Sequence, residues 1–272
     1  MLYCNKQLSI IFCMNKTIGI PLFIVALALV VWMPHSVAHA APGDSVPLLD
    51  SDSDGLSDEA ERLIYYSNPS IADTDGDGYS DGDEIKNGFS PINNKNISLK
   101  LLDADKDGLN DDWEIKLKSD LMKPDTDGDG IKDGKEVIDG FSPTSIDKKT
   151  VAKKIEVNVK NFTLKYYNGG VLLDSILVST GAWGYPTPRG TFAVLKKKPT
   201  VNYGGTGYGY SYPGTKWNLH FTSRKYGYFI HGAYWHNNFG KKNVSHGCVN
   251  VAYKDMERLY NWSQVGTPVH VQ

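Results

Sequence analysis

Apolar and polar positions divide the chain into an apolar leader, a polar middle and a stretch of alternating strands. Residues 18–32 form an apolar run, and Ala38-His39-Ala40 after it has the small-residue pattern of a cleavage site. We therefore predict an export signal over residues 1–40, which either Met1 or Met14 could begin. The alternative is an uncleaved anchor, although a spanning helix needs about 20 apolar residues and this run is shorter.

The end of the chain carries the pattern of a mainly β fold. Ile155, Val157 and Val159 alternate with polar residues, as one face of a strand does. Asn168-Gly169-Gly170 is a hairpin signal between two further stretches. Further strands are expected over residues 161–166, 171–180, 191–195, 217–221, 228–231 and 269–271, and one helix over residues 253–262. We predict a mainly β domain over residues 148–272, a sandwich or closed sheet with little helix.

The polar middle, residues 41–147, repeats a short acidic loop four times. In residues 50–61, carboxylates stand at loop positions 1, 3, 5 and 9, glycine at position 6 and glutamate at position 12. Alternate carboxylates let a curled loop surround a hard cation such as Ca²⁺, and glycine permits the turn. The predicted Ca²⁺ ligands are Asp50, Asp52, Asp54, Asp58 and Glu61; Asp73, Asp75, Asp77, Asp81 and Glu84; Asp103, Asp105, Asp107, Asp111 and Glu114; and Asp125, Asp127, Asp129, Asp133 and Glu136.

The four loops form two pairs, which end at Phe89-Ser90-Pro91 and at Phe141-Ser142-Pro143, 52 residues later. Only short helices, such as residues 59–66 and 112–118, fit between the loops. The alternative for this region is an acidic, disordered linker. Because its carboxylates repel one another, we expect the region to be disordered in chelator and ordered by calcium.

Charge separates the two regions. Residues 41–147 hold 27 acidic and 10 basic residues, whereas residues 148–272 hold 4 and 17, so the net charges are −17 and +13. This contrast predicts two modules with different partners. It also suggests a hypothesis of regulation, in which the calcium-free acidic region folds onto the basic domain and blocks it.

The candidate chemistry lies at Ser245-His246-Gly247-Cys248-Val249-Asn250. The two other cysteines fall in the predicted signal, and an odd cysteine in an exported protein suggests a reactive thiol. If this segment is extended, His246, Cys248 and Asn250 share one face, and Gly247 allows close approach. His231, at the end of another expected strand, is the candidate base. The alternative is a zinc site made by His231, His246 and Cys248.

Two nearby features have more than one interpretation. Residues 201–213 are rich in glycine and tyrosine, which favours either a mobile lid over the site or a surface loop. In the lid interpretation, Tyr210 or Tyr212 contacts the substrate. His236 lies between the two His-Gly motifs and is a further candidate for substrate contact.

Four blocks of residues are similar, in the same order, to the L,D-transpeptidase (YkuD) catalytic domain, over about residues 153–272. They are Ser179-Thr180-Gly181, residues 186–192, Ile230-His231-Gly232 and Ser245-His246-Gly247-Cys248-Val249-Asn250. Many family members carry arginine at the position of Asn250, and some, including the mycobacterial type, carry asparagine. Residues 50–143 resemble the thrombospondin type 3 repeats of bacterial surface proteins.

The resemblance implies a β-sandwich enzyme that needs no cofactor for catalysis and acts on peptidoglycan stem peptides. Cys248 would attack the carbonyl between diaminopimelate and D-Ala of a donor stem. An amine of a neighbouring stem would then resolve the thioester into a 3→3 cross-link. His231 would be the base and then the acid, and His246 would orient the site. The N–H groups of Gly247 and Cys248 would bind the oxyanion, supported by Ser245 and Asn250. A carbapenem would also acylate the cysteine.

Other outcomes of the same chemistry stay open. Water as the acceptor gives an L,D-carboxypeptidase, and a protein lysine gives anchoring of a wall or surface protein. A function of another class is a non-catalytic, calcium-dependent module that binds the cell surface. We expect the protein in the periplasm, cell wall or cell surface, with no nucleic-acid partner, and at the membrane only through an uncleaved signal.

Overall fold

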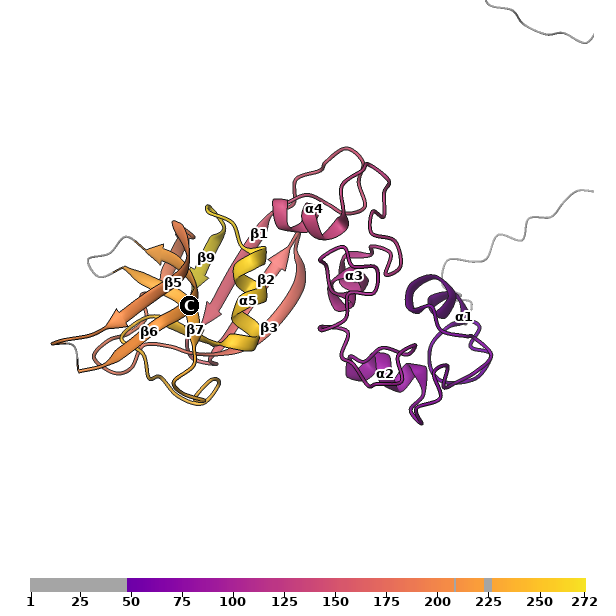
Figure 1. Ribbon diagram of the computed structural model, residues 1–272, viewed down its shortest axis with the longest axis horizontal. Helices are drawn as coiled ribbons and strands as arrows, with labels where there is room; N and C mark the ends of the chain where they lie inside the picture. Colours follow the sequence, from indigo (N-terminus) through magenta and orange to yellow (C-terminus); the bar gives the residue numbers. More distant parts are fainter. Residues whose placement is uncertain (1–47, 208, 223–226) are drawn as a thin grey trace, which may run out of the picture. The chain divides into compact units, whose positions relative to one another are not determined.

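The computed structural model describes residues 48–207, 209–222 and 227–272 (Figure 1). The acidic repeats and the β domain belong to one compact unit, Pro47–Gln272. The predicted export signal, residues 1–40, lies outside the described residues. Within the described part of the chain, no helix is both long and apolar enough to span a membrane.

Short helices follow the acidic loops. They are α1 (Asp58–Ala60) with the π-helical turn η1 (Glu61–Tyr65), α2 (Asp81–Asn87), α3 (Asp111–Leu117) and α4 (Asp133–Asp139). Ser57, Ser80 and Asn110 cap the first three helices with side-chain oxygens that accept backbone N–H groups. Left-handed residues end them, such as Lys118 with φ 65°. The short helices expected at residues 59–66 and 112–118 are therefore confirmed, each beginning one residue earlier.

The two pairs of loops end in the same way. Phe89 forms an antiparallel bridge with Ser98, and Phe141 forms the same bridge with Thr150. Gly88 and Gly140, which precede the two phenylalanines, both adopt positive φ and end a helix. The 52-residue repeat in the sequence is thus also a repeat in structure.

The strands of the described chain join into one mixed sheet. They are β1 (Lys153–Asn158), β2 (Thr163–Asn168), β3 (Val171–Ser179), β4 (Gly190–Ala193), β5 (Lys196–Gly204), β6 (Ser211–Thr222), β7 (Tyr228–Ala233), β8 (Val249–Ala252) and β9 (Pro268–Val271), with α5 (Tyr253–Trp262) before the last. Their order is β4-β9-β1-β2-β3-β8-β7-β6-β5. Only the β1–β9 and β7–β8 pairs among them are parallel.

The sheet curls until its two ends meet. β4 contacts β6, the Leu195 N–H donates to the His220 carbonyl oxygen at 2.6 Å, and Phe192 meets Phe221 edge to face. The core between the two halves contains Ile155, Val157, Leu164, Leu219, Ile230, Val249 and Val251, all fully buried. Met256, Leu259 and Trp262 come from one face of α5 and close this core. The predicted mainly β domain with little helix is confirmed, in the form of one curled sheet.

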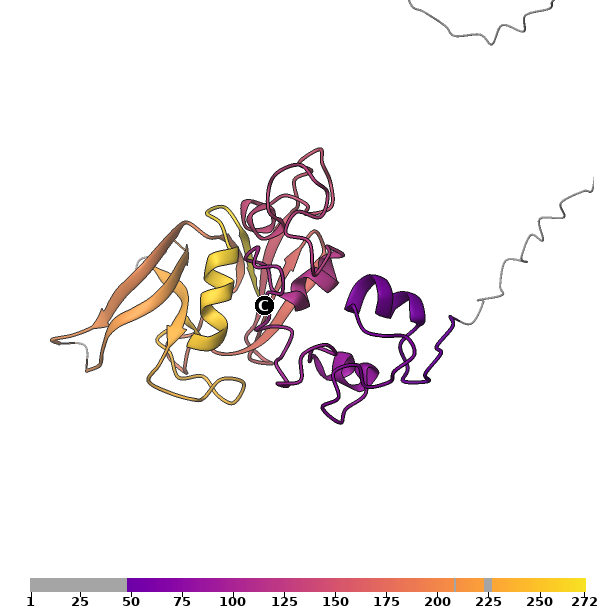
Figure 2. The same cartoon turned by 45° about the vertical axis from the view of Figure 1, so that its right-hand side comes forward.

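The prediction for residues 201–213 was incomplete. This segment contributes to two long paired strands, β5 and β6, which form a projecting ribbon in Figure 2. Val201 pairs with Thr215 and Tyr203 with Tyr212, so only the tip between the strands remains a loop. The glycine-rich tract is therefore largely a β-hairpin.

The second pair of loops shares its core with the sheet. Leu109, Trp113 and Val137 belong to the same buried cluster as Tyr166 and Trp262. Polar contacts also join the repeats to β3. Lys100 forms an ion pair with the buried Asp174 at 2.7 Å, and Lys116 Nζ donates to the Leu173 carbonyl oxygen at 2.8 Å. Lys153 Nζ donates to the carbonyl oxygens of Ile138 and Trp262. The change of charge at residue 148 therefore does not coincide with a break in the hydrophobic core.

Candidate active site and calcium loops

The segment that carries Cys248 is held by the Ser179-Thr180-Gly181 block. The backbone N–H groups of Val244 and Ser245 both donate to the Thr180 carbonyl oxygen at 3.1 Å. The Ala182 N–H donates back to the Ser245 carbonyl oxygen at 2.8 Å. These bonds fix the chain immediately before the cysteine against the end of β3.

Residues 245–248 form a bend, so the extended conformation considered for residues 246–250 is wrong up to Cys248. Ser245 Oγ donates to the Cys248 carbonyl oxygen at 2.6 Å and accepts the Gly247 N–H at 3.1 Å. Gly247 has φ 107°, and a Cβ there would lie 2.3 Å from the Tyr228 ring. Strand β8 begins only at Val249. The bend, rather than strand alternation, brings His246 and Cys248 to the same pocket as Asn250.

His231 is arranged as a neutral base. Its Nδ1 lies 2.8 Å from the Gly232 carbonyl oxygen, which can only accept, so Nδ1 carries the proton and Nε2 keeps its lone pair. The side chain is 3% exposed, and burial lowers the pKa of His231 to about 4. Tyr203 stacks on the ring at 4.6 Å between centroids. The imidazole therefore stays uncharged at neutral pH with a fixed orientation.

Cys248 rests as a thiol. Burial raises the pKa of Cys248 to about 11, although a backbone hydrogen bond from Phe229 acts in the opposite direction. Cys248 and His231 line the same pocket: His231 lies on β7, and Cys248 directly precedes the neighbouring strand β8, where Val249 pairs with Ile230. A half-buried thiol in the same pocket as a neutral imidazole needs proton transfer to become a nucleophile. An uncharged imidazole with Nε2 unprotonated has the form that a general base requires.

The pocket is small and has aromatic walls. It encloses about 70 Å³ and is lined by Tyr203, Tyr210, Tyr212, His231, Trp235, Val244, Ser245, His246, Cys248 and Asn250. Tyr212 stacks on Trp235 at 3.9 Å between centroids, and Tyr210 stacks on the exposed His246 at 4.8 Å. Tyr210 and Tyr212, named from the sequence as candidate contacts, do line it.

All six catalytic residues predicted from the sequence lie at or beside this pocket, Gly247 being the one that only shapes the bend. The Asn250 side chain, 2% exposed, lies next to His231 across the β7–β8 pair. Tyr203 and Trp235 were missed, because their role depends on the β5–β6 hairpin and on the loop after β7. His231, His246 and Cys248 are not among the groups of described residues whose ligand atoms come close enough for a metal.

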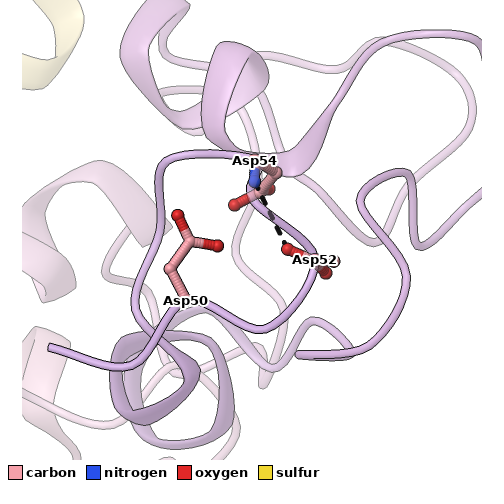
Figure 3. Close-up of side chains that lie close together, drawn as sticks. All are labelled: Asp50, Asp52 and Asp54. Atoms are coloured by element: carbon pink, nitrogen blue, oxygen red, sulfur yellow. Dashed lines mark hydrogen bonds between the residues drawn. The ribbon is translucent and has the colours of Figure 1, made fainter.

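The acidic loops place carboxylates around a common centre. Figure 3 shows the first loop, where Asp50, Asp52 and Asp54 offer oxygens within 4.8 Å of one another. Loop positions 1, 3 and 5 are gathered in the same way in the other three loops. Backbone N–H groups hold these side chains; for instance, Gly55 N–H donates to Asp50 Oδ2 at 3.2 Å.

The glutamates at position 12 show that these centres suit a cation. Glu84, Glu114 and Glu136 are at most 3% exposed, and neither carboxylate oxygen of any of them has a hydrogen-bond partner. Burial, together with the neighbouring aspartates, raises the pKa of Glu84 to about 7 and that of Glu114 to about 9. Buried carboxylates without donors are costly unless a positive charge joins them, and a Ca²⁺ ion takes six to eight oxygens.

The aspartates at position 9 accept hydrogen bonds within their own loops. Asp58, Asp81 and Asp133 each accept the backbone N–H and the hydroxyl of the serine or threonine at position 2 of the same loop. The aspartates at position 5 link the loops in pairs, because Asp54 accepts the Gly82 N–H and Asp107 accepts the Gly134 N–H. The residues that fit a metal are therefore those at positions 1, 3, 5 and 12.

Two parts of the chain match known protein families. Residues 152–271 match the model of the L,D-transpeptidase catalytic domain (YkuD), and residues 50–69, 73–88 and 125–140 match the bacterial TSP3 repeat. These residues form a YkuD-family L,D-transpeptidase catalytic domain preceded by TSP3 repeats. The third loop, residues 103–114, lies outside the matched ranges but gathers its carboxylates in the same way.

Several relatives match part of the chain. The chain is 34% identical to "Probable L,D-transpeptidase 3" of Mycobacterium tuberculosis over 35% of its own length and 37% of that protein. It is 30% identical to L,D-transpeptidase 1 of the same organism, over 42% and 47% of the two chains. A solved L,D-transpeptidase from Mycobacterium smegmatis is 27% identical over 46% of this chain and 60% of that one, with a TM-score of 0.42. The chain thus spans less than half the length of these two curated relatives.

Proposed function

We propose that this protein is an exported L,D-transpeptidase that forms peptidoglycan cross-links through a thioester on Cys248. The observation that carries the proposal is the convergence of three groups on one pocket: a half-buried thiol, an imidazole whose Nε2 keeps its lone pair, and a polar amide. The YkuD family of the catalytic domain supports the substrate class. Export is supported by the sequence pattern of residues 1–40 and by the kind of wall polymer on which such a domain would act.

Acylation begins at the thiol. As Cys248 Sγ attacks the carbonyl carbon between diaminopimelate and D-Ala, His231 Nε2 takes the thiol proton. The carbonyl oxygen becomes an oxyanion and is stabilised by the Cys248 N–H. The Gly247 N–H already donates to Ser245 Oγ, so an oxyanion role for Gly247 would require it to leave that bond. When the C–N bond breaks, His231 returns its proton to the amine of the departing D-Ala.

Transfer repeats these steps in reverse. An amine of a neighbouring stem attacks the thioester carbon and gives a proton to His231. The C–S bond then breaks, the new amide is released, and the Cys248 sulfur regains its proton from His231. The thioester conserves the acyl energy of the donor, so no nucleotide is needed. Water in place of the amine would give carboxypeptidase activity, and a protein lysine would give anchoring to the wall.

The acidic repeats would bind Ca²⁺ as structural ions. In each loop the carboxylates at positions 1, 3 and 5, together with the glutamate at position 12, would hold the ion. Bound calcium would neutralise part of the −17 charge and fix the short helices that follow the loops. None of the residues that line the described catalytic pocket comes from the repeats, which favours a structural role over direct blocking of the pocket.

A reaction with defined stems tests the function. Full-length protein, with calcium present, would be mixed with a disaccharide-tetrapeptide, and the products would be followed by mass spectrometry. We expect release of D-Ala and a 3→3 linked dimer from the wild type and neither from Cys248→Ala. Release of D-Ala with only the tripeptide as product would identify a carboxypeptidase. No release from folded wild-type protein would overturn the enzymatic proposal and favour the surface-binding module.

A further inference from the structure

We propose that Tyr203 is a positioning residue for His231, whose ring covers one face of the imidazole and keeps water away from it. This inference rests on the proposed function and adds a residue to its mechanism. Tyr203 belongs to β5, a strand with most of its side chains exposed. Of the described residues of β5, Tyr203 alone lines the catalytic pocket. One side chain of an otherwise peripheral strand therefore reaches the site.

The Tyr203 ring contacts the face of β7 that points away from the hydrophobic core. Phe229 and His231 stand two residues apart on this strand and share that face, whereas Ile230 between them is fully buried in the core. The Tyr203 and His231 rings stack with 4.6 Å between centroids and 29° between planes. Phe229 meets the same tyrosine edge to face at 5.8 Å. One aromatic ring thus contacts both side chains.

A buried amide holds the hydroxyl end of Tyr203. Asn218 of β6 is fully buried, and its NH₂ group donates to the carbonyl oxygens of Thr215 at 2.9 Å and Lys198 at 3.2 Å. Because both carbonyls can only accept, the amide oxygen is the end that meets the phenol, and Tyr203 Oη donates to it at 2.8 Å. Asn218 is also the partner of His231 across the β6–β7 pair. The anchor of the tyrosine and the base are therefore tied to the same part of the sheet.

The Tyr203 hydroxyl does not itself exchange a proton in this site. Burial, and after it the nearby Cys248, raises the pKa of Tyr203 well above its ordinary value. The proton stays on the phenol, where it is held by Asn218 Oδ1. Tyr203 therefore acts through its contact with His231 and not by proton transfer.

Burial keeps the His231 base uncharged. It is the largest cause that lowers the pKa of His231 to about 4; the hydrogen bond with the Gly232 carbonyl oxygen acts in the opposite direction, and His236 adds a smaller lowering. Removal of the Tyr203 ring would open one face of the imidazole to water. The pKa of His231 should then rise towards its ordinary value of about 6.5.

No acidic side chain is among the described residues that line this pocket. The backbone partners of His231, on β6 and β8, are the neutral Asn218 and Asn250. The titratable groups nearby are Tyr203 and Cys248, whose pKa values burial raises, His236, whose pKa burial lowers, and His246. With no carboxylate in the pocket to stabilise an imidazolium, the exclusion of water decides the charge of His231.

The pH dependence of acylation by imipenem tests the proposal. Full-length, calcium-loaded wild type, Tyr203→Ala and Tyr203→Phe would be compared, with Tyr79→Ala, an exposed tyrosine of the repeats, as the matched control. If the pKa of His231 rises to about 6 in Tyr203→Ala, only about one ring in ten is neutral at about pH 5. We therefore expect Tyr203→Ala to lose about tenfold more rate at about pH 5 than at about pH 8.

The phenylalanine variant separates the ring from the hydroxyl. Tyr203→Phe keeps the cover and loses only the anchor, so its rate should depend on pH as in the wild type, whatever its overall level. A loss in Tyr203→Ala that is the same at both pH values would show a packing role only. Equal pH profiles for the two variants would mean that the ring does not shield His231. Either result would overturn the inference.

A direct titration of His231 keeps this inference apart from the proposed function. Its ring C–H signals in NMR spectra, assigned by comparison with His231→Gln, report the pKa whether or not the protein is acylated. We expect a midpoint near 4 in the wild type and in Tyr203→Phe, and a midpoint of about 6 in Tyr203→Ala. An unchanged midpoint in folded Tyr203→Ala would refute the inference. If the wild type is not acylated, the proposed function fails, and the midpoints still decide whether Tyr203 shields His231.

Discussion

Replacing Trp113 by alanine should destabilise the catalytic sheet, although Trp113 belongs to the acidic repeats. The side chain is 4% exposed and meets Tyr166 edge to face at 5.8 Å between centroids. Tyr166 is fully buried and packs in turn on Trp262 of α5. A truncation at Trp113 thus opens a cavity against residues of β2 and α5.

The size of the effect follows from this burial. Replacing a buried tryptophan by alanine costs about 3–5 kcal/mol. Trp113 Nε1 has no hydrogen-bond partner, so the truncation leaves no polar group behind. For a domain of this size, each kcal/mol lowers the unfolding midpoint by roughly 2–4 °C, so we expect a fall of about 10 °C. The loss is a large part of the about 5–15 kcal/mol that stabilises a typical domain.

The assay must report on the sheet itself. Hydrogen exchange read by mass spectrometry on peptides from β2 and β3, in calcium, follows the region that Trp113 covers. Trp183, which is fully exposed, provides the control Trp183→Ala. Faster exchange in β2 and β3 for Trp113→Ala alone would agree with a shared core. If only peptides of the repeats exchanged faster, the repeats and the sheet would be independent units and the reasoning would be refuted.

Three further predictions concern the calcium loops and the catalytic residues. Glu114→Gln and Glu84→Gln should each weaken calcium binding in titration calorimetry, but only Glu114→Gln, next to Trp113, should lower the unfolding midpoint of the sheet. At calcium 100-fold above Kd, the stabilisation lost is up to about 2.7 kcal/mol. Equal unfolding midpoints for the two variants would argue against coupling between the repeats and the sheet. Acylation by imipenem should fall as the pH drops through about 4, where His231 gains its proton, with no step near the ordinary histidine pKa of about 6.5. A rate that instead climbs with pH towards about 11 would show that only a thiolate formed by titration of Cys248 reacts, without a general base. Gly247→Ala should abolish acylation, since φ 107° and the Tyr228 ring both exclude a Cβ, and a folded, active variant would contradict the role given to the bend.

Much of the site could be predicted because its signals are local in the sequence. The twelve-residue loops carry their ligands at fixed spacings, and the helix α5 shows its buried face at Met256, Leu259 and Trp262. Strand β5 was missed for a physical reason. It lies outside the core with most of its side chains exposed, so it has no apolar alternation to reveal it.

The rest depends on contacts between distant segments. The contact of His236 Nε2 with the Asn250 side-chain amide, at 2.9 Å, depends on the path of the loop after β7, which no spacing rule gives. The bend at Gly247 depends on the Ser245 hydroxyl and the Tyr228 ring together. Trp113 could be placed on a short helix from the sequence, but its packing against Tyr166 could not.

The central claim is that Cys248 is an activated nucleophile in a pocket that accepts an acyl group. The most direct test is the intact mass of full-length, reduced, calcium-loaded protein after mixing with imipenem, with Cys248→Ala alongside. We expect one imipenem adduct on the wild type and none on the variant. A folded wild type without an adduct, or an equal adduct on Cys248→Ala, would contradict it.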